Sequence, residues 1–224
     1  MVIEIEKNWE RLKIGIIGTR SKCFANVLKK NGFNYIMLND LKQIDSTFDF
    51  IFESGVYKII PEKILNIPKY GFVGTHETPL PEGKGHAPIQ WTVLNNRSNL
   101  VVSLYKLNAG VDSGELINQH NIHFEKTDTL HTMNKKREIA IEKCFDVFIK
   151  EVKQGYMVLR KQSGKGSYHK KRKPSHNQLD LNKKLIDLWD EIRICDNDKY
   201  PAWFSINDKK VIIKYFVEEN NDNL

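Results

Sequence analysis

The sequence lacks the features of several large classes of protein. Its 224 residues contain no run of about 18 uncharged apolar residues, so no segment is predicted to span a membrane. Only three cysteines are present, widely spaced and without a Cys-x-x-Cys pair, which argues against a disulfide framework and a cysteine zinc site. The first 11 residues have no apolar core of a signal peptide, and we expect a cytoplasmic protein.

Motifs for nucleotide phosphates and for zinc proteases are also missing. The first apolar run ends Gly15-Ile16-Ile17-Gly18-Thr19-Arg20, which is neither G-x-G-x-x-G nor a P-loop. The pair His76-Glu77 is not followed by a second His, because position 80 is Leu, and the neighbouring prolines prevent the required helix. The sequence therefore predicts no metal site.

The positive charge is confined to one segment. The net charge is +7, from 35 basic and 28 acidic residues. Residues 160–173 hold seven basic residues and no acidic residue, and the rest of the chain is balanced at 28 of each sign. This distribution argues against a broad surface for nucleic acid. Two interpretations stay open for the segment, a solvated linker and a local site for an anion.

Short β-branched runs alternate with helical patterns, which is typical of an α/β fold with a mostly parallel sheet. A helix capped by Ser21 is expected to end at residues 31–32, and a long helix is expected to be capped by Thr127 or Asp128. A second, smaller part starts near residue 156. The expected strands are 13–18, 34–38, 48–52, 71–74, 100–106, 115–124, 202–204 and 210–217, and the further helices are 61–65, 87–94 and 182–194.

One His and one Asp fall on loops at the same predicted sheet edge. His76 ends a predicted strand, and Asp112 lies between glycines in the strand connection 107–114. Ligands of open α/β sheets bind beyond the carboxyl ends of the strands. A His and an Asp placed there can form a base and its orienting partner. The alternative, a polar turn with a structural His, remains open on the residues alone.

Several motifs in residues 13–205 resemble the formyltransferase family that uses 10-formyltetrahydrofolate. That family carries Asn-x-His, Ser-Leu-Leu-Pro, a glycine-rich turn and Ala-Pro-Ile-Gln-Trp, followed by a turn of the form x-x-G-x-D-x-G. The corresponding segments here are Gly74-Thr75-His76-Glu77-Thr78-Pro79-Leu80-Pro81, Gly83-Lys84-Gly85-His86-Ala87-Pro88-Ile89-Gln90-Trp91 and residues 108–114. Residues 51–61, 172–174, 179–180 and 200–204 extend the resemblance.

The resemblance implies a Rossmann-like formyltransferase core over residues 12–155, with a mostly parallel sheet and helices on both faces. Residues 156–224 would form a basic linker and a short helix and β extension. The implied reaction is attack of an acceptor amine on the formyl carbon of 10-formyltetrahydrofolate, through an oxyanion, with His76 as base or oxyanion stabiliser and Asp112 as its orienting partner. The implied folate-binding residues are Glu53, Ser54, Gly55, Val56, Tyr57, Ile59 and Gly114.

One position of the expected catalytic set departs from the family. The family's Asn, two residues before the His, is Gly74 in this chain. Loss of one oxyanion donor costs about 100- to 1000-fold in rate at comparable sites. Thr78, His86 or a bound water are candidates to replace the donor.

The C-terminal segment is more similar to the sugar N-formyltransferases, which act on nucleotide-linked amino sugars, than to the tRNA enzyme. Two alternatives stay open, a methionyl-tRNA formyltransferase-like enzyme and a non-catalytic folate- or nucleotide-binding module. Nucleic acid and membrane partners are not expected, whereas an apolar strand near 210–217 predicts a homodimer. The residues expected to contact the acceptor are Thr78, Pro79, Lys84, Gly85, His86, Lys170, Lys171 and Arg172.

Overall fold

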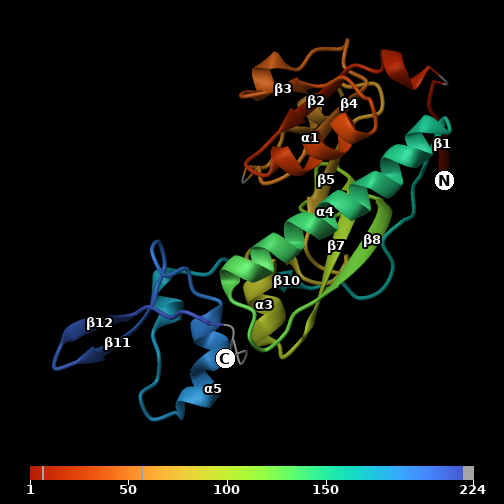
Figure 1. The fold of residues 1–224 in the computed structure, drawn as a ribbon. Coiled ribbons are helices and arrows are strands. Elements are labelled where there is room, and N and C mark those ends of the chain that lie inside the picture. Colours follow the sequence, from red (N-terminus) through yellow and green to blue (C-terminus); the bar gives the residue numbers. More distant parts are fainter. Residues whose placement is uncertain (7, 57, 219–224) are drawn as a thin grey trace, which may run out of the picture.

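The computed structural model describes residues 1–6, 8–56 and 58–218 and shows an α/β core with an extension on one side (Figure 1). The expected folate residue Tyr57 lies outside the described residues. The central sheet has six strands in the order β3-β2-β4-β5-β7-β8. Its strands are β2 (Ile14–Ile17), β3 (Ile36–Met37), β4 (Phe50–Glu53), β5 (Phe72–His76), β7 (Asn99–Lys106) and β8 (Leu116–His123).

The first four strands of this order are parallel, and β7 and β8 are antiparallel to their neighbours. Strands β2, β4 and β5 are buried along their whole length because both faces of the sheet are covered there, whereas both residues of the edge strand β3 are exposed. The predicted α/β class with a mostly parallel sheet is thus confirmed.

Helices cover both faces of the sheet. On one face lie α1 (Ser21–Lys30) and α4 (Leu130–Lys153), whose Phe24 and Phe145 rings have centroids 5.8 and 4.7 Å from that of Phe52 in β4. On the other face, Leu65 of α2 (Glu62–Leu65) packs in a buried cluster with side chains of β4 and β5. Another helix, α3 (Pro88–Leu94), packs against the start of β7.

Two predicted helix caps are wrong by one or two residues. Thr129, not Thr127 or Asp128, caps α4, and its hydroxyl accepts from the Thr132 N–H. The Asp128 carboxylate instead accepts from the Glu125 N–H and the Thr132 hydroxyl. Ser21 is the first residue of α1 rather than its cap. All of these residues are typical caps, so the sequence alone cannot choose among neighbours.

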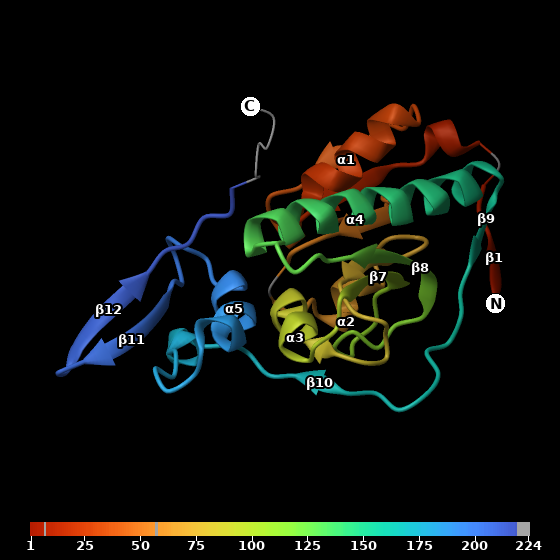
Figure 2. The same cartoon turned by 60° about the horizontal axis from the view of Figure 1, so that its bottom comes forward.

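The chain returns along the core after α4. Strand β9 (Tyr156–Val158) pairs antiparallel with β1 (Val2–Glu4), and β10 (Tyr168–His169) pairs parallel with β6 (Lys84–Gly85). These pairings were not predicted, because strands of two or three residues carry no periodic signal. They bring the basic segment beside the loop that follows β5 (Figure 2). The domain boundary at 155/156 stays a prediction.

The C-terminal extension has its own small apolar cluster around Leu188, Ile192 and Ala202. It consists of α5 (Leu185–Arg193) and a hairpin of β11 (Ala202–Ile206) and β12 (Lys209–Ile213), and Figure 2 shows the hairpin projecting away from the core. Three one-turn helices lie at Trp9–Arg11, Leu41–Gln43 and Pro174–Asn177. The homodimer expected through the C-terminal extension stays a prediction. No helix in the described ranges combines the length and apolar character needed to cross a bilayer.

Candidate active site

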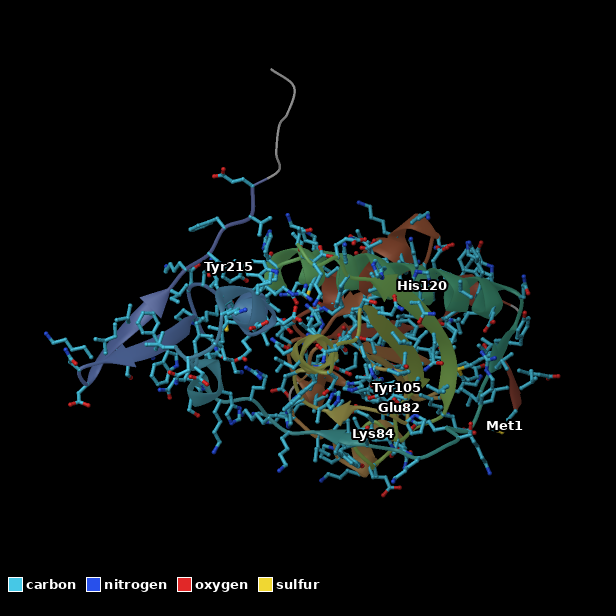
Figure 3. All side chains as sticks on the ribbon, turned by 90° about the horizontal axis from the view of Figure 1, so that it is seen from below. Met1, Glu82, Lys84, Tyr105, His120 and Tyr215 are labelled. Atoms are coloured by element: carbon cyan, nitrogen blue, oxygen red, sulfur yellow. The ribbon has the colours of Figure 1, made fainter. Side chains whose placement is uncertain are left out.

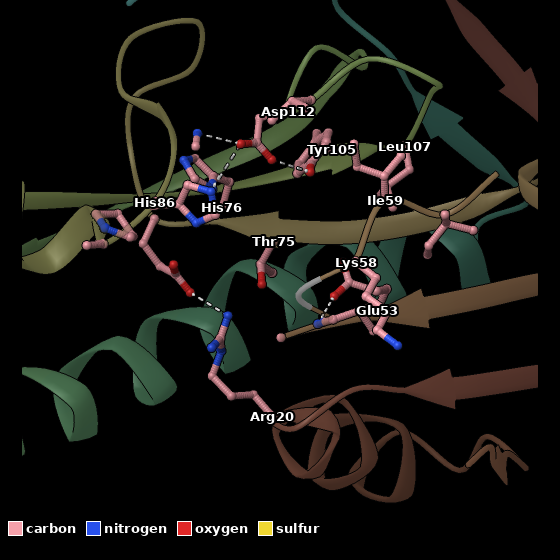
Figure 4. Close-up of a pocket in the computed structure, with 18 of the residues that line it drawn as sticks. Arg20, Glu53, Lys58, Ile59, Thr75, His76, His86, Tyr105, Leu107 and Asp112 are labelled. Carbon is pink, nitrogen blue, oxygen red and sulfur yellow. Dashed lines mark hydrogen bonds and ion pairs between the residues drawn. The ribbon is translucent and has the colours of Figure 1, made fainter. Parts of the chain in front are cut away.

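A cavity of about 620 Å³ opens at the carboxyl ends of β4 and β5 (Figure 4). Loops after β2, β4, β5 and β7 form its walls, together with the first turns of α4. Its position agrees with the rule for open α/β sheets. Eight residues expected at the site line it, namely Glu53, Gly55, Val56, Ile59, His76, Gly85, His86 and Asp112.

The loop that carries Asp112 is held in place by the returning chain. Asp112 has a left-handed backbone with φ +45°. The Gln162 amide donates to the main-chain carbonyls of Asp112 (2.9 Å) and Gly114 (2.8 Å). A Cβ on Gly114 would lie 1.7 Å from the Lys106 carbonyl oxygen, so the close approach of the two backbones requires glycine. The folate-binding role expected for Gly114 stays a prediction.

His76 lies between two oxygen acceptors. Its Nε2 is 3.0 Å from the Gly83 carbonyl oxygen, and its Nδ1 is 3.6 Å from Asp112 Oδ2. Because a carbonyl can only accept, Nε2 must be the protonated nitrogen. Nδ1 is then the nitrogen that faces the Asp112 carboxylate across a gap longer than a hydrogen bond.

Two donors fix the Asp112 carboxylate. Oδ1 accepts from the Tyr105 hydroxyl at 2.9 Å, and Oδ2 accepts from the Gly85 N–H at 2.8 Å. Burial and the nearby Asp112 charge raise the pKa of Tyr105 well above its usual value, so Tyr105 stays a phenol that donates. The carboxylate is therefore held rigidly beside His76 (Figure 4).

Gly74 and Glu53 are neighbours across two parallel strands. They are in register between β4 and β5, so their side-chain positions share one face of the sheet. A Cβ on Gly74 would lie 2.6 Å from Leu107 Cδ1 and 2.9 Å from Glu53 Oε2. The Glu53 and Leu107 side chains therefore fill the space that a side chain at position 74 would need.

A group of three charged side chains at the site was not predicted from the sequence. The buried Glu77 carboxylate lies 3.2 Å from Arg20 Nη2 and 4.0 Å from Arg137 Nε, and all three residues line the cavity. The only available signals were the adjacency of Glu77 to His76 and the position of Arg20 after the first strand. Arg137 is in the middle of a long helix, where no local pattern marks it.

Several expected site residues lie away from the cavity lining. Ser54 is outside the lining, although its hydroxyl lies 3.0 Å from that of Thr75, which lines the cavity. Lys84, labelled in Figure 3, lines a separate hollow of about 380 Å³. The Arg172 guanidinium donates to the His176 carbonyl and to Asn177 Oδ1, both at 3.0 Å. The others outside the lining are Gly74, Thr78, Pro79, Gly114, Lys170 and Lys171.

Neither thiol chemistry nor a metal cluster is indicated by the described residues. All three cysteines are buried, and burial raises the pKa of Cys23 and Cys195 to about 11 and that of Cys144 to about 12. These groups are thus neutral thiols rather than nucleophiles. Within the described ranges, no three His, Cys, Asp or Glu side chains are placed to hold a metal ion.

Comparisons with known proteins agree with this architecture. The chain is 27% identical over 203 residues to the methionyl-tRNA formyltransferase of Thermodesulfovibrio yellowstonii, which covers 89% of this chain and 63% of that protein. A 4-N formyltransferase from Francisella tularensis shares the fold, with a TM-score of 0.78 and 16% identity over 94% of this chain and 99% of that chain.

A third relative is similar in both sequence and structure. The formyltransferase PseJ from Anoxybacillus kamchatkensis is 27% identical, with a TM-score of 0.62, over 80% of this chain and 94% of that chain. Its crystal structure holds UDP-4,6-dideoxy-4-formamido-L-AltNAc and tetrahydrofolate. The family model described as formyl transferase matches residues 29–145, about half of the chain, and includes His76 and Asp112. The chain belongs to the formyl transferase family.

Proposed function

We propose that this protein transfers a formyl group from 10-formyltetrahydrofolate to the amine of a nucleotide-linked amino sugar. The observation that carries the proposal is the similarity to PseJ, whose structure holds a UDP-linked formamido sugar and tetrahydrofolate. The His76–Asp112 pair at the cavity supports it, because acyl transfer to an amine needs a base at the reacting nitrogen.

Part of the cavity lining is apolar, which suits a ring-shaped ligand. The side chains of Val56, Ile60, Leu65 and Leu107 form this part. An apolar slot with few polar groups is typical of sites for ring-shaped ligands. The folate-binding roles of Glu53, Gly55, Val56 and Ile59 rest on this lining and on the family resemblance, and that of Ser54 rests on the resemblance alone. When bound, the donor supplies the formyl carbon that the acceptor attacks.

His76 is placed to accept the proton that the acceptor amine loses. Its Nε2–H is held by the Gly83 carbonyl, so the Nδ1 lone pair is the basic site. Asp112 Oδ2, 3.6 Å from Nδ1, can stabilise the positive charge that forms on the attacking amine or on the ring. The hydrogen bond to the Gly83 carbonyl orients the ring before the acceptor binds.

A second candidate acceptor is an aminoacylated tRNA, which the similarity to the Thermodesulfovibrio yellowstonii protein favours. The two acceptors are separated by incubating the protein with 10-formyltetrahydrofolate and either a panel of UDP- and dTDP-linked amino sugars or aminoacylated initiator tRNA. We expect an N-formyl product only with an amino sugar. A product only with tRNA would overturn the acceptor assignment, and folate binding with no product would support a non-catalytic module.

Lys170 and Lys171 are proposed to bind the acceptor pyrophosphate. Strand β10 places the preceding residues beside β6, and Trp91 Nε1 donates to the Lys170 carbonyl at 2.9 Å. The double variant Lys170→Gln/Lys171→Gln should raise the acceptor KM at least several-fold without changing the KM for folate, because two charges facing a phosphate pair are lost.

The matched control is Lys29→Gln/Lys30→Gln, which removes two exposed charges from α1. Steady-state kinetics at two salt concentrations provide the measurement. An acceptor KM unchanged by Lys170→Gln/Lys171→Gln would assign the segment to a solvated linker.

A further inference from the structure

Glu53 is a buried carboxyl group at the site that takes no part in the proton transfer assigned to His76. It ends β4, lines the cavity and is only 7% exposed. Its Oε1 accepts from the Val56 N–H at 2.6 Å, whereas its Oε2 faces the space above Gly74. When this carboxyl is neutral, its proton therefore belongs on Oε2, because Oε1 is already an acceptor.

We propose that the neutral carboxylic acid of Glu53 donates a hydrogen bond to the formyl oxygen of the donor, in place of the missing side chain at position 74. This inference rests on the proposed function. A side chain at position 74 would begin 2.9 Å from Glu53 Oε2. The Oε2–H group thus lies where an amide attached to residue 74 would act, on the same sheet face as His76.

Two neighbouring donors at the site are already engaged. The Nε2–H of His76 is directed at the Gly83 carbonyl, and the hydroxyl of Tyr105 is directed at Asp112. Thr78, considered from the sequence as a replacement donor, is not among the residues that line the cavity. The atoms nearest to a side chain at position 74 belong to Leu107 and Glu53, and of these two side chains only that of Glu53 can carry a donor.

The surroundings of Glu53 make the neutral form available near neutral pH. Burial raises its pKa to about 7, and the Val56 N–H and the Arg20 guanidinium oppose the rise. The carboxylates of Glu77 and Asp112 add to it, and the neutral phenol of Tyr105 faces the same space. A carboxylic acid kept neutral by its site can serve as an oxyanion donor. The donor is present below pH 7 and is lost as the pH rises.

In the reaction, a bond forms between the acceptor nitrogen and the formyl carbon, and the bond between that carbon and N10 of the folate breaks. The acceptor amine loses one proton to His76, and N10 gains one. Glu53 keeps its own proton and stabilises the negative charge on the formyl oxygen until the carbonyl reforms. No redox partner is needed.

Two variants of Glu53 test whether this residue donates a hydrogen bond to the formyl oxygen. Glu53→Leu removes the donor and should lower kcat by about 100- to 1000-fold at pH 6.5. Glu53→Gln keeps an acceptor for Val56 and a donor beside Gly74, so its kcat should stay within about tenfold of wild type. The ratio of the kcat of Glu53→Gln to that of the wild type should rise above pH 7, because the Glu53 carboxyl of the wild type ionises there. Equal loss in both variants, or no loss in Glu53→Leu, would overturn the proposal.

A binding measurement tests the same claim without turnover. The probe is 10-formyl-5,8-dideazafolate, a stable analogue that carries the formyl group on N10. At pH 8 the wild type should take up a measurable fraction of a proton on binding, because the formyl oxygen favours the neutral acid. Calorimetry in buffers of different ionisation enthalpy measures this uptake, and Glu53→Gln should show none.

A wrong role for Glu53 and a wrong proposed function would give different results. Probe binding without proton uptake would overturn the role of Glu53 and leave the proposed function standing. Proton uptake without formylation of any amino sugar would keep Glu53 and overturn the acceptor assignment. Failure of the wild type to bind the probe would overturn both.

Discussion

Replacing His76 with Gln should lower the rate of formyl transfer by about 100- to 10,000-fold, the usual contribution of a positioned base. Gln can still donate to the Gly83 carbonyl, as His76 Nε2 does at 3.0 Å, but it has no lone pair that accepts a proton near pH 7. Asp112→Asn should cause a loss of similar order, because it removes the negative charge 3.6 Å from Nδ1. Single-turnover rates with saturating donor and acceptor provide the measurement.

Folate binding should survive both substitutions, because the apolar part of the cavity is untouched. A matched control is His123→Ala, which removes an exposed histidine of β8 and should leave the rate unchanged. Full activity in His76→Gln would contradict the assignment of His76 as the base. If His76→Gln loses its thermal transition as well as its activity, the smaller substitution Asp112→Asn becomes the test of the His76–Asp112 pair.

Restoring the family's asparagine by Gly74→Asn should destabilise the protein rather than improve it. The new Cβ would lie 2.6 Å from Cδ1 of the partly buried Leu107 and 2.9 Å from Oε2 of the buried Glu53. Overpacking of this kind costs about 1–3 kcal/mol. For a chain of this size, the Tm should fall by about 2–12 °C. Thermal unfolding measures the fall in Tm, and single-turnover rates show that activity does not improve.

The double variant Glu53→Ser/Gly74→Asn should recover much of the lost Tm, because the shorter side chain vacates the space. It should also transfer formyl groups faster than Glu53→Ser alone, since an amide donor returns beside His76. Additive effects of the two substitutions would show that residues 53 and 74 do not share one space, against the account given above.

The sequence was sufficient to predict the main sheet and the pairing of His76 with Asp112. The predicted strands carry apolar, β-branched runs between turn residues, and the site follows from the rule that ligands bind at the carboxyl ends of parallel strands. The catalytic roles of both residues remain predictions, but the two side chains do lie 3.6 Å apart.

The partner of Gly74 could not be predicted, because it depends on strand order. Glu53 and Gly74 are 21 positions apart and become neighbours only because β4 pairs with β5 in this register. Arg137 reaches Glu77 from the long helix for a similar reason, and Gln162 reaches the Asp112 loop from the returning linker. Contacts of this type are set by the packing of distant segments, which local periodicity does not encode.

Transfer of a labelled formyl group tests the central claim most directly. The protein is mixed with 10-formyltetrahydrofolate carrying ¹³C in the formyl group and with a UDP- or dTDP-linked amino sugar, and the label is followed by NMR. With at least one amino sugar, the wild type should move the label from N10 to a sugar formamide, and His76→Gln should leave it on the folate. Retention of the label on the folate by the wild type with every amino sugar, or equal transfer by His76→Gln, would contradict the account.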